Sequence, residues 1–347
     1  MKITLGSREL EIISGSIIRS MDTAASEWSC VIPEVDQAVD QELYNLIKPR
    51  SFAPATGSID GTKLCTGNKY ITSATVTNNG SGVMLQGFSK TFRLSVSNPR
   101  QQREFLQSSL KDISLAFSRP FGLVVKSDNS IANEMNEKFE DEKIGALEIV
   151  YAFLQDLARQ RGILMSDDVF GNIKYLKANI QQKTVGSIIE GEDGLVPMAQ
   201  DFKATFDDTQ IKQNYYSINN SKWSRLLSNP VGVSKNTSIK IPSFKAIQLD
   251  SLIEGAGQKA VDFARNYDLA TSMQMPFEVE GHYAPNGELW KENTFVSVVS
   301  PSLFVPDGFT FLIRQVEYKE DSDGGKRTIL SFIPPSLYAG GNIEEPW

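Results

Sequence analysis

The hydrophobic and polar positions of the first hundred residues alternate in short runs, as β-strands do. Trp28, Cys30 and Ile32 fall on one face of a strand over 28–33. A shorter strand is expected over 17–20. These runs are separated by turn residues, a pattern typical of a small barrel or sandwich.

A hairpin is the clearest feature of this first part. The β-branched run 70–77 is followed by the Asn- and Gly-rich turn 78–82 and by the apolar run 83–87. The segment 48–62 carries two prolines and two glycines. It is therefore predicted to be a long surface loop.

The pattern changes near Ser97, where apolar residues begin to recur at helical spacing. Asn98 can cap a helix and Pro99 can take its first position, with Pro120 ending it. The predicted apolar face of this helix comprises Leu106, Leu110, Ile113 and Phe117.

A second helix is predicted over 147–161, with Gly162 as its left-handed C-terminal cap. Its apolar stripe comprises Leu147, Val150, Tyr151, Leu154, Leu157 and Ala158. A strand over 163–165, a turn over 166–172 and a strand over 173–176 follow. The segment 98–184 is therefore predicted to be a helix-containing α+β domain.

The remainder returns to β structure after an irregular stretch. Strands are expected over 202–206 and 211–218, a polar exposed excursion over 221–242, and a helix over 252–267. The last strands are expected over 277–283, 295–299, 311–319 and 326–333, the final two flanking a Gly-rich hairpin turn.

These elements predict a mainly β protein with an α+β insert: two small β-barrel domains plus the helix-containing domain. The first barrel spans 1–97. The second spans 185–339, with the polar and helical excursion at about 221–270, and 340–347 form a flexible tail. The two outer parts are similar in kind, which suggests duplicated barrels, although no repeat is visible residue by residue.

Charge and hydropathy narrow the class of protein. The formal net charge is −7 and the isoelectric point is near 5.1, unlike the basic footprint of a nucleic-acid binder. The first residues lack the charged-then-apolar order of a signal peptide, and no apolar stretch approaches the ~20 residues that span a bilayer. We expect synthesis in the host cytoplasm and no membrane insertion.

The search for catalytic or metal-binding residues gives little. The single histidine, His282, precedes a hairpin turn and is expected to be structural, as are the two strand cysteines, Cys30 and Cys65. No phosphate-binding glycine loop occurs. The pair Asp167–Asp168 lies in a tight turn, where aspartate is favoured for local hydrogen bonds rather than catalysis. No cofactor and no metal site are expected.

Two tryptophans have less obvious roles. Trp290, between a turn and a strand, is suited to anchor a β-turn as a buried aromatic. Trp347 ends a short Gly-rich tail beside Glu344 and Glu345. This tail is either disordered or a docking peptide that binds a partner through these three residues.

Three stretches resemble the baseplate hub proteins of Mu-like contractile-tailed phages. They are the Leu-Cys-Thr-Gly run 64–67 with its hairpin through 85–87, the helix-and-hairpin segment 152–175, and the Gly-Glu-Leu-Trp run 287–290 continuing to the Pro-Pro pair 334–335. More distantly the chain is similar to phage late-control tail proteins and to the N-terminal half of the type VI secretion spike protein. A longer loop at 48–62 and a shorter tail depart from the family pattern.

The resemblance implies a structural, non-enzymatic hub in the tail baseplate of a virion. In such hubs each subunit contributes two similar barrels, so a homotrimer presents six. That ring adapts a six-fold tail tube to a three-fold central spike and leaves a lumen for DNA passage. The implied partners are a second and third copy, the spike, the tube and the baseplate wedge proteins, with DNA only in passage.

Other functions remain open from the residues alone. The hub could belong to a phage-derived contractile injection device. Less favoured is a tail-associated peptidoglycan hydrolase using Asp167 and Asp168 as its carboxylate pair. A monomeric carbohydrate-binding β protein would instead need exposed aromatic platforms.

Overall fold

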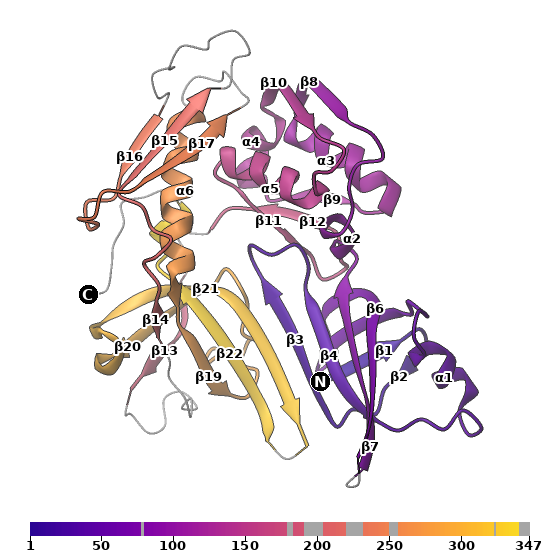
Figure 1. The fold of residues 1–347 in the computed structure, drawn as a ribbon. Coiled ribbons are helices and arrows are strands. Elements are labelled where there is room, and N and C mark those ends of the chain that lie inside the picture. The colour runs from indigo at the N-terminus through magenta and orange to yellow at the C-terminus, as the bar shows by residue number, and fades with distance from the viewer. Residues whose placement is uncertain are drawn as a thin grey trace.

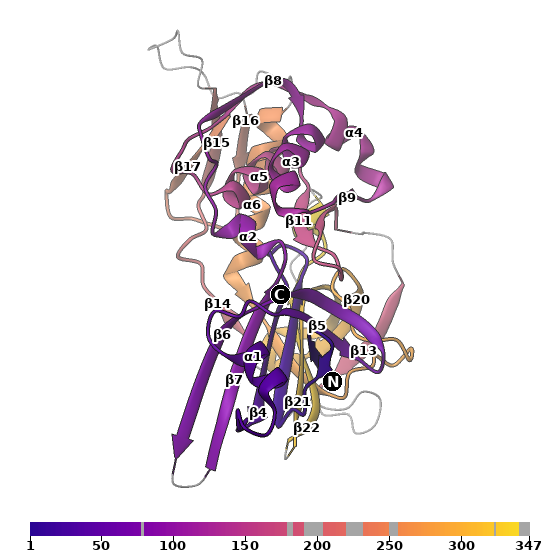
Figure 2. The same cartoon turned by 90° about the vertical axis from the view of Figure 1, so that its right-hand side faces the viewer.

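The computed structural model of the chain describes residues 1–77, 80–178, 183–190, 204–219, 232–249, 256–322 and 324–339. Figures 1 and 2 show a large β-sheet with a helix-containing region at one end of it. The mainly β class with a helix-containing part is confirmed.

Twelve strands make up the large sheet, and they come from both ends of the chain. The first half of the sheet comprises β1 (Lys2–Leu5), β2 (Arg8–Glu9), β3 (Ser14–Ser20), β4 (Glu27–Pro33), β5 (Pro54–Ile59), β6 (Thr62–Thr77) and β7 (Gly80–Ser89). The second half comprises β13 (Thr184–Ile189), β19 (Pro276–Glu280), β20 (Phe295–Ser300), β21 (Val305–Asp321) and β22 (Gly325–Ile333). The strand order is β13-β20-β21-β3-β4-β7-β6-β5-β1-β2, with β19 beside β22. The antiparallel pairing of β21 with β3 makes the two halves one continuous sheet.

The first-half strands confirm most of the predicted pattern. Trp28, Cys30 and Ile32 are all buried on one face of β4, and β6 and β7 form the predicted hairpin. The predicted surface loop 48–62 is wrong in part, because 54–59 form β5 between β1 and β6. Pro54 stands at the first position of the strand, where it is tolerated, and the side-chain-free Gly57 leaves room for Ile17.

One hydrophobic core lies under both halves of the sheet. It is built mainly from alternate residues of the strands, together with Ile47 of helix α1 (Gln41–Ile47) and residues of connecting segments such as Trp290. Trp28 and Trp290, each at most 1% exposed, are its largest members. The two halves therefore share a core as well as a strand ladder.

The helix-containing region follows β7 and has its own core. Its elements are α2 (Phe92–Ser95), β8 (Arg103–Ser109), α3 (Leu110–Ser118), the 3₁₀ turn 119–121, β9 (Val125–Ser127), the 3₁₀ turn 129–131, α4 (Ala132–Asn136), β10 (Lys138–Ile144), α5 (Val150–Gln160), β11 (Leu164–Asp167) and β12 (Ile173–Leu176). β8 pairs with β10, and β11 and β12 form the predicted hairpin with β9 on the far side of β12.

The predicted helix from Asn98 is wrong in its first half. Residues 103–109 form a strand, and Leu106 is 63% exposed instead of facing a helical core. The helix begins at Leu110 because Ser109 and Asp112 form a reciprocal capping box. From there the predicted face is correct, since Leu110, Ile113 and Phe117 are buried.

The second predicted helix is confirmed as α5, although it starts three residues later. Leu147 is 93% exposed and precedes the helix, while Leu154, Leu157 and Ala158 of the predicted stripe are buried. Gly162 has φ +65°, as the predicted left-handed cap requires.

A third group of elements lies mostly in the chain between β13 and β19, which both belong to the second half of the sheet. It comprises β14 (Thr205–Phe206), β15 (Asn214–Asn219), β16 (Gly232–Lys235), β17 (Phe244–Leu249), α6 (Ala256–Ser272) and β18 (Met273–Gln274), followed later by the 3₁₀ turn 301–303 and α7 (Ser336–Ala339). The predicted polar excursion 221–242 is wrong at 232–235, which pair with β15. The predicted helix over 252–267 is confirmed from Ala256 and continues to Ser272.

The two halves of the sheet repeat one pairing pattern. β4, β5, β6 and β7 follow one another in the chain, and so do β19, β20, β21 and β22. β4 pairs with β7, β5 with β6 and β6 with β7, and the second set pairs in the same three ways. The duplication suggested by the sequence is thus present in the strand pairing.

The repeat extends to the irregularities of the two longest strands. In β6 the register shifts at Tyr70, immediately after the part paired with β5. In β21 it shifts at Arg314, immediately after the part paired with β20. Beyond these bulges, residues 71–77 correspond one by one to residues 315–321. Beyond its bulge β21 has β3 in place of β20, whereas β6 keeps only β7 as a neighbour among the described strands.

Candidate functional site

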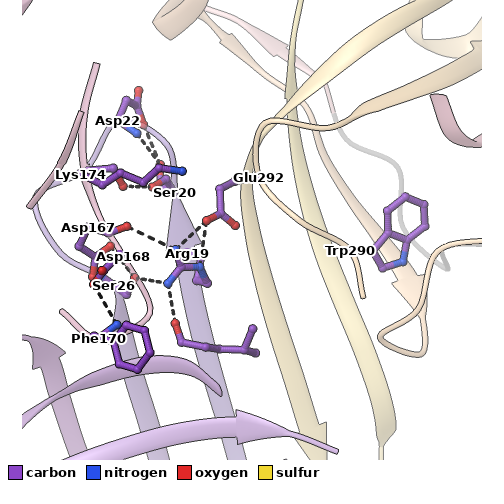
Figure 3. A network of polar contacts seen from close by, with 12 residues as sticks. Arg19, Ser20, Asp22, Ser26, Asp167, Asp168, Phe170, Lys174, Trp290 and Glu292 are labelled. Atoms are coloured by element: carbon purple, nitrogen blue, oxygen red, sulfur yellow. Dashed lines mark hydrogen bonds and ion pairs between the residues drawn. The ribbon is translucent and has the colours of Figure 1, made fainter. Parts of the chain in front are cut away.

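A buried arginine joins the first half, the second half and the helix-containing region. Arg19 of β3 is 6% exposed, and its guanidinium lies between Glu292 and the end of β11 (Figure 3). It donates to the Glu292 carboxylate from Nε at 2.9 Å and from Nη2 at 2.7 Å. It also donates to the carbonyl oxygens of Leu64 in β6 and of Asp167 in β11.

The charges at this junction stabilise one another. Burial by itself would lower the pKa of Arg19, but the negative charges of Glu292 and Asp167 outweigh it and raise that pKa. Burial would likewise raise the pKa of Glu292, and the Arg19 charge and hydrogen bonds lower it instead. Both groups are therefore ionised at neutral pH. They form a buried ion pair that links the two halves of the sheet.

A second polar cluster lies on the turn that joins β3 to β4. The Asp22 carboxylate, 4% exposed, accepts hydrogen bonds from Ser20 Oγ at 2.7 Å, Arg314 Nε at 2.9 Å and Tyr338 Oη at 2.6 Å. Arg314 is the bulged residue of β21 and Tyr338 belongs to α7. The Asp22 carbonyl oxygen also accepts from Gln155 of α5. One turn thus fastens β21, α5 and α7 together.

Aromatic rings extend this cluster into the helices. Tyr338 stacks on Tyr267 of α6 with ring centroids 6.0 Å apart, and the Arg159 guanidinium of α5 lies 4.2 Å from the Tyr267 ring centroid. The cluster therefore ties the helices to the sheet.

The carboxylate pair Asp167–Asp168 is divided between two structural roles. Asp167, 2% exposed, accepts from the Ser26 N–H at 3.1 Å and from Ser26 Oγ at 2.8 Å, and burial raises its pKa. Asp168 accepts from the Phe170 and Asn172 N–H groups of the turn and pairs with Lys126. The predicted turn role of Asp168 is confirmed, whereas Asp167 instead anchors the β3–β4 turn.

The histidine and the cysteines are buried. His282 is 1% exposed, its Nδ1 lies 3.1 Å from Thr328 Oγ1, and burial lowers its pKa to about 4 although Glu320 opposes this. Cys30 and Cys65 are free thiols, and burial raises the pKa of Cys30 to about 12. No group of metal-ligating side chains occurs within the ranges described above.

The predicted tail residues Glu344, Glu345 and Trp347 lie outside the described residues. Trp290 is buried as expected, and its carbonyl oxygen accepts the Tyr318 hydroxyl. Among the helices that the structure describes, none is both long and apolar enough to cross a membrane.

The face of the sheet opposite the core is polar and hollowed where the halves meet. The hollow is lined by residues of β3, β4, β7, β19, β21 and β22, among them Ser16, Ser29, Glu278, Glu317 and Lys319. Its lining includes four acidic side chains, at 278, 317, 320 and 321, and two basic ones, at 319 and 327. We call this surface, on β3, β4, β21 and β22 with its rims on β7 and β19, the open face. It is polar and mildly acidic.

Sequence reasoning missed Arg19, Asp22 and Glu292. Each stands alone among residues of ordinary type, and nothing in the local pattern links them. One signal was available: Arg19 interrupts an apolar strand beside Ile17 and Ile18, so a buried charge with a distant partner was to be expected.

The comparisons with known proteins point to phage baseplate and tail proteins. Residues 254–340 match the family model of the Mu phage baseplate assembly protein GpP, fourth domain. The baseplate hub protein gp44 of Escherichia phage Mu is 23% identical over 331 residues, covering 92% of this chain and 84% of that protein.

Solved structures extend the likeness to the whole chain. The 43 kDa tail protein of prophage MuSo2 from Shewanella oneidensis has a TM-score of 0.76 at 20% identity, covering 97% of this chain and 98% of that one. A component of the E. coli type VI secretion system, described as similar to the T4 tail proteins gp27 and gp5, has a TM-score of 0.56 at 9% identity. That match covers 97% of this chain and 75% of the other. At these identities the structural matches show a shared fold.

The resemblance to the baseplate hub proteins of Mu-like phages, first seen in three stretches of sequence, is thereby confirmed along nearly the entire chain.

Proposed function

We propose that the chain is a structural baseplate hub of a contractile phage tail and assembles as a homotrimeric ring. The observation that carries this proposal is the duplication of strand pairing within one continuous sheet, joined at β3 and β21. The likeness to phage tail and hub proteins supports the same role.

The duplication supplies a physical reason for three copies. Two halves with the same pairing pattern present nearly equivalent surfaces, so three chains present six such surfaces around one axis. A closed ring of this kind matches six tube subunits on one side while keeping three-fold symmetry for a central spike on the other. The tube, spike and wedge proteins of the baseplate are the partners of this ring.

The open face suits the lining of a passage for DNA. Its two basic side chains, Lys319 and Arg327, are paired with Glu317 and Glu278, so its lining offers no cluster of lysine and arginine that would bind phosphates and slow transit. In this proposal the DNA touches the ring only while it passes.

The domain boundaries expected from the sequence, 1–97, 98–184 and 185–339, stay part of the proposal. So do the location in the virion baseplate and the docking role of Glu344, Glu345 and Trp347.

Deletion of 340–347 should then weaken spike attachment in a pull-down and leave the ring intact. Unchanged attachment would remove the tail as an anchor.

The way the two carboxylates Asp167 and Asp168 are used supports a non-enzymatic role. Asp167 is buried with its carboxylate oxygens bonded to Ser26, so it is not accessible to a polymeric substrate. Asp168→Asn should assemble normally with no change in cell-wall hydrolysis. Normal assembly combined with lost lysis would favour the peptidoglycan hydrolase.

Electron microscopy of the purified chain tests the proposed function. Rings with three-fold symmetry and six similar lobes are expected, and they should bind both tube and spike proteins. Particles without a central opening would contradict the proposal. A hub from a phage-derived injection device would give the same rings and differ only in the particle that contains them.

A further inference from the structure

A pocket of about 530 Å³ opens where the first half, the second half and the helix-containing region meet. In β21 the side chains of Glu317 and Lys319 line the open face, whereas Tyr318 between them lines this pocket. Because alternate residues of a strand point to opposite faces, the pocket lies on the side of the sheet away from the open face. We call this cavity, which lies between 62–64, 126–128, 168–170 and 291–292, the junction pocket.

Lysines from all three parts line the junction pocket, although the chain as a whole has a net charge of −7. They are Lys63 of β6, Lys126 of β9, Lys174 of β12 and Lys291. Together with Arg19 they make five basic side chains, against three acidic ones at 128, 168 and 292. The pocket is therefore a positively charged site on an acidic protein.

The ion pairs of the lining leave two of these charges over. Each acidic side chain pairs with one basic side chain: Glu292 with Arg19, Asp168 with Lys126 and Asp128 with Lys174. Lys63 and Lys291 are exposed, and neither pairs with a carboxylate within the part of the chain that the structure describes. The pocket thus presents two ammonium groups that are free to pair with a ligand.

An exposed aromatic ring lies among these lysines. Phe170, 50% exposed, stands on the turn between β11 and β12, where its N–H donates to the Asp168 carboxylate at 2.9 Å (Figure 3). The ammonium groups of Lys63 and Lys126 lie 5.3 Å and 5.2 Å from the centroid of the ring. These cation–π contacts hold both charges beside an apolar surface.

The geometry favours carboxylates spread along a peptide over one phosphate group. A phosphate site usually has backbone N–H groups that converge on one point, as at a helix N-terminus. No α-helix of the described chain begins among the residues that line this pocket. The charges stand instead on lysines of separate segments, and each lysine acts as a mobile point charge, whereas arginine would grip one anion in two places.

We propose that the junction pocket binds an acidic segment of a partner protein. Carboxylates of the segment pair with Lys63 and Lys291, and an apolar or aromatic side chain between them packs on Phe170. DNA in the proposed passage does not reach this pocket, because the pocket and the open face lie on opposite sides of the sheet. The inference goes beyond the proposed function and does not depend on the ring, since one chain supplies the whole pocket.

Isothermal titration calorimetry of the full chain with a synthetic peptide tests the pocket. The probe is a peptide with blocked ends in which glutamates flank one tryptophan. We expect saturable binding of one peptide per chain, weakened at least about tenfold as salt is raised from about 50 to about 300 mM. The same peptide with glutamines in place of the glutamates should not bind. Absence of binding by the glutamate peptide at low salt would overturn the proposal.

Removal of the two unpaired charges shows where the peptide binds. Lys63→Gln combined with Lys291→Gln should weaken the binding about tenfold. The control combines Lys111→Gln with Lys235→Gln, which makes the same change in net charge at two exposed residues outside the pocket. The control should bind within about twofold of wild type. Equal losses in the two double variants would overturn the pocket as the site, and circular dichroism checks that both variants are folded.

A single substitution should strengthen the binding. In Asp168→Asn the amide Oδ1 can still accept the N–H groups of Phe170 and Asn172, as the carboxylate Oδ1 does. Lys126 then loses its carboxylate partner and is free to pair with the peptide. The affinity should rise about threefold. An affinity equal to or below that of wild type would contradict a site in which the lysine charges decide the binding.

Other occupants would give different results. A single-stranded oligonucleotide that binds more tightly than the peptide, and loses this binding in the Lys63 and Lys291 double variant, would overturn the acidic segment in favour of nucleic acid. A chain lacking 340–347 that binds the peptide at least about tenfold more tightly than the full chain would assign the pocket to the chain's own Glu344 and Glu345. A trimeric ring that does not bind the peptide would overturn this inference and leave the proposed function standing.

Discussion

The two halves of the sheet use the same strand pairing but fill and close it differently. In the first half the large Trp28 of β4 packs where β7 has Gly87, and a Cβ on Gly87 would lie 2.4 Å from the Trp28 ring. At the equivalent positions of the second half, β22 has the large Phe332 where β7 has Gly87. Met275, the residue before β19, stands where β4 has Trp28. The bulk has moved to the opposite strand while the backbone pattern has stayed.

The difference explains why the duplication was not visible as a sequence repeat. A core needs the right total volume and patterning, and different pairs of residues supply it equally well. What both halves retain is the pairing and the bulge, at Tyr70 in one and Arg314 in the other. The backbone, rather than the residue identity, carries the duplication.

Removal of Arg19 should have the largest effect on stability, because this side chain holds the two halves of the sheet in one arrangement. Arg19→Ala leaves Glu292 without its partner and should lower the free energy of unfolding by about 3–5 kcal/mol. Chemical denaturation measures the change. Arg327→Ala is the control, since the Arg327–Glu278 pair lies near the surface and should contribute less than about 1 kcal/mol. Equal effects of the two substitutions would mean that the junction is not a fixed cross-link.

Acid should weaken the second half before the first. Burial lowers the pKa of His282 to about 4, below about 6.5 for the unfolded chain, so the unfolded state binds the proton more readily. The stability due to neutral His282 is fully present above pH 6.5 and is lost as the pH falls toward 4. The loss should approach about 3 kcal/mol.

Hydrogen exchange between pH 7 and pH 4 measures this effect in each half. The β19–β22 region should lose protection first, and His282→Gln should remove most of the difference between the halves. The same loss of protection in wild type and variant would assign the acid sensitivity to other groups.

Gly87→Ala should destabilise the first half by about 1–3 kcal/mol, since the added methyl group meets both the Trp28 ring and the Asn68 carbonyl oxygen. Thermal unfolding measures the change. Gly82→Ala on the same strand is the control, because its added methyl would have only ordinary contacts, at 3.4 Å or more, and should be nearly neutral. A neutral Gly87→Ala would show that the first-half core adapts as readily as a loosely packed one.

The sequence predicted the elements whose pattern is local. The β6–β7 hairpin and helix α5 follow from turn residues and from an apolar stripe. β8 was missed because its strand character comes from β10, which is distant in the chain. β5 was missed although the Asp60–Gly61 turn that joins it to β6 is a local hairpin signal, because the prolines and glycines of 48–62 indicated a loop. The capping box at Ser109 was the local signal that marked the true start of α3.

The junction could not be predicted for the same reason. Arg19 and Glu292 are 273 residues apart, and Asp22 and Tyr338 are 316 apart. No spacing rule connects such residues, and only the fold brings them together. The role of Asp168 was predictable, because its partners at 170 and 172 lie in the same turn.

The central claim, that three copies of this two-half chain close a ring, is tested most directly by the native mass of the purified protein. Light scattering over a range of concentrations should give a mass three times the 38.5 kDa of one chain, with no larger species as the concentration rises. A mass of two chains, or one that grows without limit, would contradict a closed ring of three.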